Sequence, residues 1–144
     1  MPLDTHVILP FAGGKFRFHL TEDELFDLET GNLRDPMRRH KPIRVGEAYA
    51  RLIAGRFVID GKDVGMAGRA EYSVVEMNEI IRAALQGGGG GVTDQGEEIN
   101  WKEYDIHSWM RRYVYPMPLA ERWDLALAAL GARVEGRERV DGEA

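Results

Sequence analysis

The sequence contains no cysteine, no long apolar run and no surplus of positive charge. Without cysteine the chain has no disulfides, no thiolate nucleophiles and no cysteine zinc sites. No apolar run approaches the roughly 20 residues of a membrane-spanning helix, so we expect a soluble protein without a membrane partner. Lys and Arg number 19 against 24 Asp and Glu, a formal net charge of −5. This charge disfavours a sequence-independent nucleic-acid binder, which needs surplus cations to neutralise phosphates.

With 144 residues the chain has the size of one domain with its own core. The first residues lack the basic and apolar regions of a secretory signal, so the expected location is the cytoplasm. We expect a single globular domain over residues 1–131. Residues 132–144 are charged and poor in apolar side chains, which predicts a disordered tail.

The strongest local signal is a helix that begins after Ser73 and ends at a run of glycines. Ser73 and Glu76 have the spacing of a capping box, and apolar residues follow at helical intervals. Gly87 is suited to the left-handed conformation that ends helices. The glycine run is not a phosphate loop, which precedes its helix and contains Lys followed by Ser or Thr. We expect Gly87 to Gly96 to be a flexible connector without regular structure.

The N-terminal segment predicts a β-hairpin with strands over residues 6–11 and 15–20. Gly13 and Gly14 are expected to supply the positive φ angles of its tight turn. The second strand alternates apolar and polar residues, which indicates one buried and one solvent-facing side. Pro10 cannot donate to a β-ladder, so the first strand is expected at a sheet edge.

The remaining segments predict an α+β fold, in which the hairpin packs on about five short amphipathic helices. For Arg56 to Ala70 we favour a second small hairpin, with an extended insertion as the alternative. The other helices are expected from Thr21 to Gly31, Val45 to Gly55, Asn100 to Pro116 and Pro118 to Gly131.

No pattern in the sequence indicates catalysis. The four histidines lack metal-ligand spacing, and no nucleophile elbow or H-E-x-x-H motif is present. His6 and His19 are expected to meet across the hairpin as a cross-strand pair. We therefore expect no metal, no cofactor and no enzymatic activity. A site assembled from distant residues is the open alternative, which a pocket with converging titratable groups would support.

The candidate partner-binding residues are Trp101, Tyr104, Arg111 and Arg112. They lie off the apolar stripe of the helix expected after Asn100, so aromatic and guanidinium groups would gather on its outward side. These residue types are enriched at protein interfaces. The alternative is a packed Trp in the first turn beside solvated arginines. The buried stripe of that helix is expected to consist of Ile106, Trp109, Met110, Tyr113 and Val114.

Three segments carry a family resemblance: F-x-G-G-K-F-R-F-H-L-T-E-D-E-L-F-D-L-E, S-V-V-E-M-N-E-I-I-R-A-A-L-Q-G-G-G and P-L-A-E-R-W-D-L-A-L-A-A-L-G. Together they resemble the small tail proteins of gene transfer agents and related siphophages, a family described as tail assembly chaperones or tail tube proteins. The segment Arg56 to Ala70 and the longer glycine run depart from the family pattern. The matching positions are Gly14, Leu20, Thr21, Leu25, Leu28, Glu29, Val75, Ile80, Ile81, Leu85, Gly87 to Gly89, Ala126 and Leu130.

The resemblance implies a non-enzymatic tail assembly factor with no catalytic residues. Such a chaperone would bind the tape-measure protein and keep its apolar stripes from aggregating during tail morphogenesis. A helical surface with aromatic anchors suits that task. The alternative is a structural tail tube subunit, which needs an extended sheet to pair around a ring and would be incorporated in a phage-like particle. The oligomeric state is left open by the sequence.

Overall fold

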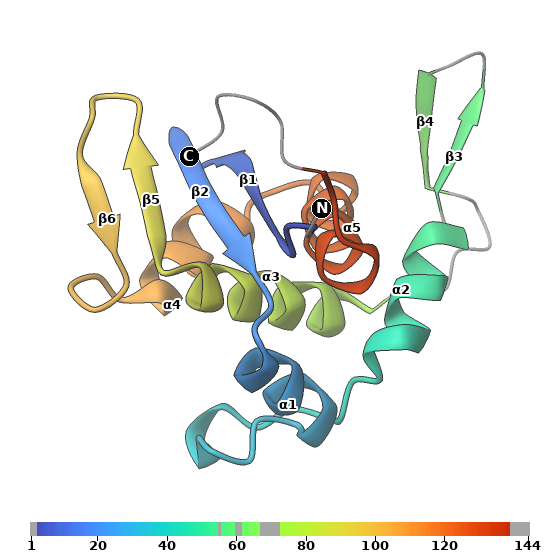
Figure 1. Ribbon diagram of the computed structural model, residues 1–144, viewed down its shortest axis with the longest axis horizontal. Helices are drawn as coiled ribbons and strands as arrows, with labels where there is room; N and C mark the ends of the chain where they lie inside the picture. The colour runs from blue at the N-terminus through green and yellow to red at the C-terminus, as the bar shows by residue number, and fades with distance from the viewer. Residues whose placement is uncertain (1–2, 55, 60–61, 67–72, 139–144) are drawn as a thin grey trace.

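A four-stranded antiparallel sheet organises the structure, a computed structural model that describes residues 3–54, 56–59, 62–66 and 73–138. Helices pack against this sheet, so the fold is α+β, as the sequence predicts. The strands lie in the spatial order β1 (His6–Phe11), β2 (Gly14–His19), β5 (Gly90–Thr93) and β6 (Glu98–Asn100), as Figure 1 shows.

β1 and β2 form the predicted N-terminal hairpin, and β1 is an edge strand, as Pro10 indicates. The register places His6 opposite His19, with ring centroids 5.9 Å apart, so the predicted cross-strand pair is confirmed. Phe16 and Phe18 are fully buried on one side of β2, which confirms the predicted alternation.

The turn of this hairpin differs from the prediction. Its positive φ angles belong to Ala12 (52°) and Gly13 (74°), whereas Gly14 is the first residue of β2. Gly14 faces the neighbouring strand so closely that a Cβ there would lie 2.6 Å from the Cα of Thr93. Gly14 therefore allows β2 and β5 to approach closely and is not needed for the turn.

The glycine run does not form the flexible connector expected from the sequence. α3 (Val74–Gly88) continues past the expected cap at Gly87, and Gly89 (φ 84°) is the left-handed cap. The next residues form β5, which pairs with β2 on one side and β6 on the other. A Cβ at Gly91 would lie 2.7 Å from the Cα of Phe16. The expectation of flexibility was wrong because glycine here allows two backbones to approach closely.

The helices of the first half of the chain largely follow the prediction. α1 (Glu22–Thr30) ends at Gly31 with a φ of 79°, although Thr21 makes no side-chain cap bond. The loop after α1 contains the short 3-10 helix η1 (Pro36–Arg38), and α2 (Val45–Ala54) follows.

The segment after α2 forms the favoured second hairpin, from β3 (Arg56–Ile59) and β4 (Lys62–Met66). Its expected turn at Asp60 and Gly61 lies outside the described residues, as does the expected helix end at Gly55. The start of α3 is as predicted, since the Oγ atom of Ser73 accepts the N–H of Glu76 at 3.2 Å.

The helix expected to begin at Asn100 begins later. Asn100 is the last residue of β6, and its Oδ1 atom accepts the N–H of Lys102 at 2.9 Å within a turn. The helix starts as α4 (Ile106–Trp109) and continues as the π-helix η2 (Met110–Val114). The Asn100 side chain thus stabilises a tight turn and does not cap a helix, because the backbone of Asn100 pairs with β5.

α5 (Leu119–Glu135) begins after Pro118 as predicted, but it does not end at Gly131. Residues 132–135 were expected in a disordered tail and are helical, because Ala132 continues the buried side of the helix. Arg137 then pairs with Asp4 through backbone hydrogen bonds. The last residues of the expected tail, 139–144, lie outside the described part of the chain.

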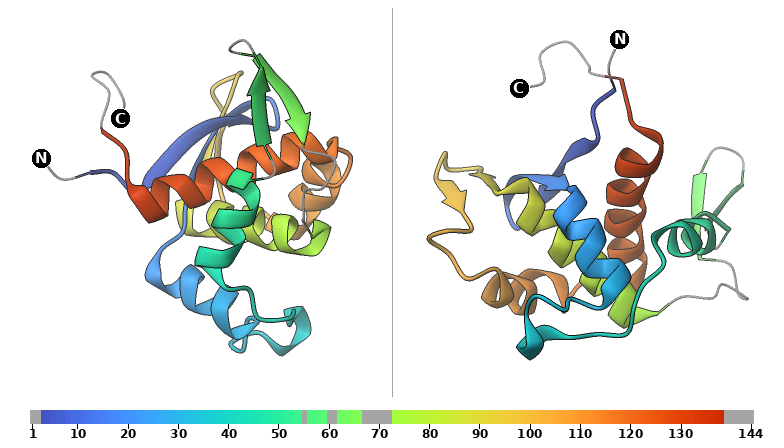
Figure 2. Two further views of the ribbon diagram at one scale, coloured as in Figure 1. Left: turned by 90° about the vertical axis from the view of Figure 1, so that its right-hand side faces the viewer. Right: turned by 60° about the horizontal axis from the view of Figure 1, so that its bottom comes forward.

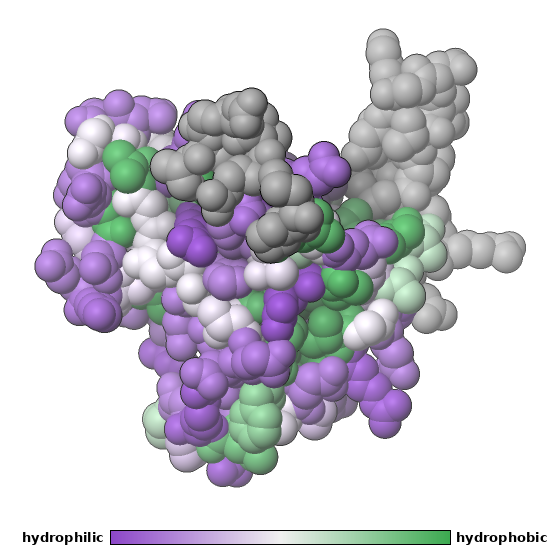
Figure 3. All heavy atoms as spheres, in the orientation of Figure 1, coloured by the Kyte–Doolittle hydropathy of each residue, from purple (hydrophilic) through white to green (hydrophobic). Residues whose placement is uncertain are grey.

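α3 lies between the sheet and α1, and Figures 1 and 2 agree on this layering. Trp123 of α5 is fully buried, and its Nε1 atom donates to the Leu52 carbonyl oxygen at 2.8 Å, which ties α5 to α2. Figure 3 shows a mostly hydrophilic face with a hydrophobic patch between α3 and α2. None of the helices in the described ranges is long and apolar enough to cross a membrane.

Candidate functional site

The predicted binding residue Trp101 lies in a cluster of aromatic rings. Its ring stacks on Phe16, with centroids 5.7 Å apart and an interplanar angle of 27°, and meets the edge of Trp109 at 5.5 Å. Aromatic pairs contribute about 0.5–1.5 kcal/mol beyond their burial. We call this group the aromatic cluster, and it consists of Phe11, Phe16, Trp101, Tyr104, Trp109 and Tyr113.

Three parts of the chain supply the aromatic cluster. The first hairpin contributes the buried Phe11 and Phe16, which form the base of the cluster. The turn after β6 contributes Trp101 and Tyr104, and the Asn100 carbonyl oxygen holds this turn by accepting the N–H of Tyr104 at 3.1 Å. α4 and η2 contribute Trp109 and Tyr113, whose ring centroids are 5.0 Å apart.

α4 is positioned by a side-chain cap that sequence reasoning placed elsewhere. The Oδ1 atom of Asp105 accepts the N–H of His107 at 3.0 Å, and Oδ2 accepts the Ser108 hydroxyl at 3.0 Å. These hydrogen bonds stabilise the ionised carboxylate, so the pKa of Asp105 lies below its usual value. The cap orients the first turn of α4 and with it the ring of Trp109.

The structure does not place Trp101 on the outward side of a helix, as the sequence prediction required. Trp101 precedes the helix, is half-buried and packs against the core, and its Nε1 atom is buried without a hydrogen-bond partner in the described part of the chain. Its ring therefore contributes to packing, which is close to the alternative weighed from the sequence. No interface contact is needed to explain its position.

The other three predicted residues are more accessible. Tyr104 is half-buried, and its hydroxyl donates to the Oε1 atom of Glu97 at 2.8 Å. Arg112 is exposed, with its guanidinium carbon 5.2 Å from the centroid of the Tyr113 ring. Arg111 is also exposed, and its Nη2 atom lies 3.4 Å from the Ser108 hydroxyl.

Tyr104 and Arg112 border one hollow, whereas Trp101 and Arg111 do not line it. This hollow has a volume of about 350 Å³ and lies between the hairpin turn, the β5–β6 turn and η2. We call it the aromatic groove. It is lined by Ala12, Gly13, Thr93, Asp94, Gln95, Glu97, Ile99, Tyr104, Trp109, Arg112 and Tyr113.

The aromatic groove combines an aromatic wall with charges of both signs. Asp94 and Glu97 are exposed on the β5–β6 side, and Arg112 lies on the η2 side. The hydrogen bond to Glu97 raises the pKa of Tyr104, since it holds the phenol proton in place. This arrangement can bind an apolar or aromatic side chain and select its charged neighbours.

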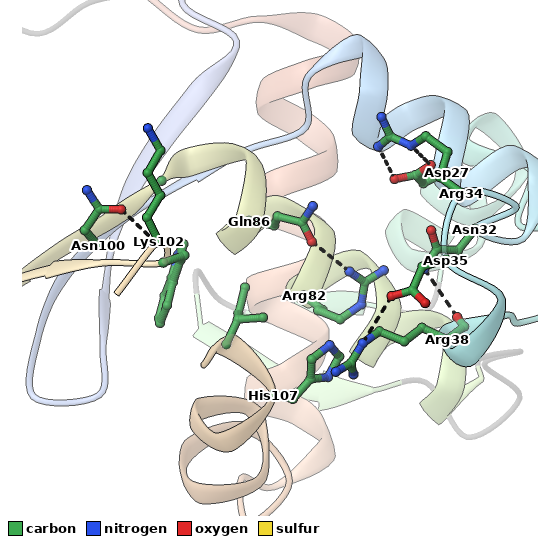
Figure 4. A pocket seen from close by; sticks show the side chains of 13 residues that line it. Asp27, Asn32, Arg34, Asp35, Arg38, Arg82, Gln86, Asn100, Lys102 and His107 are labelled. Carbon is green, nitrogen blue, oxygen red and sulfur yellow. Dashed lines mark hydrogen bonds and ion pairs between the residues drawn. The ribbon is translucent and has the colours of Figure 1, made fainter. Parts of the chain in front are cut away.

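A second, larger hollow of about 720 Å³ lies on the other side of Trp101. Figure 4 shows side chains from the α1–η1 region, α3 and the β6–α4 turn pointing into it. We call it the basic pocket, because its lining carries Arg34, Arg38, Arg82 and Lys102 against Asp27 and Asp35. The other lining residues are Asn32, Gln86, Gly89, Asn100, Trp101, Ile106 and His107.

Several charges of the basic pocket are paired within the chain. Arg34 forms a bidentate hydrogen-bonded ion pair with Asp27, and Arg38 lies 3.4 Å from the Oδ2 atom of Asp35. Arg82 is buried, and it donates to the Oε2 atom of Glu79 at 2.9 Å.

His107 and Lys102 complete the polar lining of the basic pocket. Burial and the nearby guanidinium groups of Arg38 and Arg82 lower the pKa of His107. Lys102 is exposed, and its amine has neither a hydrogen bond nor an ion pair in the described part of the chain.

Sequence reasoning did not find either hollow. Trp109 and Tyr113 were assigned to a buried stripe, but both are half-buried and line the aromatic groove. The basic loop after α1 was visible as a run of charges, but nothing in the sequence indicated that Arg38 would face His107. That proximity arises because α1 and α4 both pack on α3.

Comparisons with protein-family models, curated proteins and solved structures returned no significant match. Within the described residues, no group of three or more His, Asp or Glu side chains is arranged to hold a metal ion.

Proposed function

We propose that this chain is a non-enzymatic tail assembly factor that binds another protein, a tape-measure protein, during morphogenesis of a phage-like tail. The proposal draws on the resemblance of three sequence segments to small tail proteins of gene transfer agents and siphophages. The observation that carries it is the aromatic groove, where the rings of Tyr104, Trp109 and Tyr113 line one hollow.

The composition of this groove suits the binding of a helical, apolar-striped partner. Tyr, Trp and Arg dominate the residues whose truncation weakens protein interfaces. A volume of about 350 Å³ is at the small end for ligand sites, so the groove would take an anchoring side chain and not an entire ligand. The charges of Asp94, Glu97 and Arg112 would set the orientation of the partner segment.

Co-expression with a tape-measure protein from the same source as this chain tests the proposal. We expect the tape-measure protein to gain solubility and to co-purify with the full chain. Tyr104→Ala together with Arg112→Glu should reduce the co-purified amount about tenfold, since both changes affect the groove. The matched control is Arg44→Glu, because Arg44 is exposed just before α2 and lines neither hollow.

Two results would contradict the proposal. The first is a tape-measure protein that neither gains solubility nor co-purifies. The second comes from mass spectrometry of finished tail particles, in which many copies of this chain per particle would identify it as a tail tube subunit. Expression in the cell with absence from finished particles is the result expected of a factor that assists assembly and leaves.

A further inference from the structure

The basic pocket has a charge opposite to that of the chain as a whole. Its lining has four cationic side chains and two carboxylates, whereas the complete sequence has a formal net charge of −5. Charge of one sign collected in a hollow raises the local concentration of oppositely charged ligands. Arg34, Arg38 and Arg82 are paired with carboxylates, so Lys102 is the cation of the lining that has no acidic partner in the described part of the chain and can attract an anion.

Three side chains of this pocket have donors that no acceptor uses. Gln86 accepts from Arg82 through its Oε1 atom at 3.1 Å, and Asn100 accepts the N–H of Lys102 through Oδ1. In the described part of the chain, the amide nitrogens of both residues have no acceptor, and neither does the Lys102 amine. The carboxylates of Asp27 and Asp35 are already paired with arginines. A ligand that supplies acceptor oxygens would satisfy these donors.

Arg82, one of the cations of the pocket, is held in place by its neighbours. The Arg82 side chain is 7% exposed and is fixed by Glu79 and Gln86 on its own helix. His107 faces both Arg38 and Arg82, and its lowered pKa reflects their positive field as well as burial. Figure 4 shows these three side chains converging on the same side of the pocket. Because Arg82 is already positioned, its side chain loses little conformational entropy when a ligand binds.

The shape and walls of the pocket favour a peptide over a small inorganic anion. Its volume of about 720 Å³ is in the range of sites that enclose molecules of many atoms. Trp101 and Ile106 provide an apolar wall beside the donors. Trp101 also meets the edge of Trp109, which lines the aromatic groove, so the two hollows lie on neighbouring parts of the surface.

We propose that the basic pocket binds the side-chain carboxylates of an acidic segment in a partner protein. Lys102 and Arg38 contact the carboxylates, Gln86 and Asn100 donate hydrogen bonds, and Trp101 packs against the aliphatic part of the segment. This inference depends on the proposed function only in taking the ligand to be a protein chain.

Binding of a fluorescently labelled hexaglutamate peptide to the full chain tests this proposal. The expected result is saturable binding that weakens with ionic strength, with no binding of a hexaglutamine peptide. Lys102→Glu should weaken binding about tenfold or more. Lys15→Glu makes the same charge change on β2, away from the pocket, and should change binding less than about twofold.

Equal weakening by the two lysine variants would overturn the proposal, because the peptide would then respond to net charge and not to the pocket. Inorganic phosphate that displaces the peptide better than chloride at matched ionic strength would also overturn it, in favour of a general anion site. The two proposals fail separately. If Lys102→Glu leaves co-purification of the tape-measure protein unchanged while the Tyr104 and Arg112 changes abolish it, the pocket is not used although the assembly function holds.

Discussion

Gly88 in the last turn of α3 lies directly against the backbone of Arg17 in β2, where a Cβ atom would come within 2.5 Å of the Arg17 carbonyl carbon. No rotamer change can relieve such an overlap, because both partners are backbone. The contact sets how closely α3 approaches the sheet. It also places the following residues where β5 can pair with β2.

Gly88→Ala should therefore destabilise the protein in spite of the higher helix propensity of alanine. We expect a loss of about 2 kcal/mol or more in the free energy of unfolding, the usual cost of overpacking. The measurement is urea denaturation followed by circular dichroism. Gly46→Ala is the control, because Gly46 lies in α2 with no atom within 4 Å of its Cβ position. That variant should be neutral or more stable by about 0.5 kcal/mol, and equal losses in both variants would contradict this account.

Replacement of Trp101 separates packing from binding. Trp101→Ala removes the ring stacked on Phe16 and should lower the free energy of unfolding by about 2–3 kcal/mol, somewhat less than for a fully buried Trp. Trp101→Phe keeps an aromatic ring and removes the buried, unpartnered Nε1 donor, so most of the stability should be retained. Thermal melts of the two variants and the parent measure these changes in stability. An unchanged melting temperature in Trp101→Ala would restore the view of Trp101 as an outward binding residue.

Arg122 of α5 stabilises the segment that connects η2 to α5. Its side chain is buried and donates to the carbonyl oxygens of Tyr115 at 2.5 Å and Met117 at 3.2 Å and to the Oδ1 atom of Asn78 at 3.3 Å. Arg122→Met should lower the free energy of unfolding by about 2–3 kcal/mol, because buried acceptors lose their donors. The measurement is again urea denaturation. Arg44→Met, at a site 76% exposed, should change stability by less than about 0.5 kcal/mol.

Stability should fall as the pH drops below about 6.5. Burial, followed by the charge of nearby arginines, lowers the pKa of His19 and His107 in the folded protein below the usual value of a histidine. The unfolded chain then takes up protons at a higher pH than the folded chain, so acid favours unfolding in this window. The variant with His19→Gln and His107→Gln should show a flatter dependence of the melting temperature on pH between 7 and 5 than the parent, with both buffered at equal ionic strength.

Glu24 acts in the opposite sense. Its burial raises the pKa of the carboxyl group above its usual value, so this group favours the folded state less as the pH rises from the unfolded pKa to the folded pKa. Comparison of the parent with the double histidine variant removes this contribution, since Glu24 is common to both. Identical pH profiles in the two proteins would show that the histidines do not contribute.

The local elements were predictable wherever neighbouring residues alone decide them. Ser73 caps α3 because its side chain needs only the N–H of Glu76, three residues away. The hairpin of β1 and β2 follows from alternation and a short turn. In contrast, Asn100 has the same kind of cap sequence but lies in a strand, since pairing with β5 engages its backbone. The end of α5 was misplaced for a similar reason, because the buried Ala132 stabilises the helix beyond Gly131.

The candidate site was only partly predictable. Trp101, Tyr104, Arg111 and Arg112 were selected by residue type, and two of them, Tyr104 and Arg112, border the aromatic groove. Their grouping on one helix face was wrong, because the helix begins after Tyr104. The basic pocket was not foreseen, since its lining comes from segments that are distant in sequence.

By itself the sequence determined the fold class, the N-terminal hairpin with its buried side, and the start of α3, since short-range caps, turns and apolar periodicity specify these features. Tertiary structure decided the role of the glycine run. The same residues that suggest flexibility in isolation become the last turn of α3 and a central strand, because the absence of a side chain lets them contact β2. It also decided which charges and aromatic rings share a hollow, because that depends on how α1, α3 and α4 pack together.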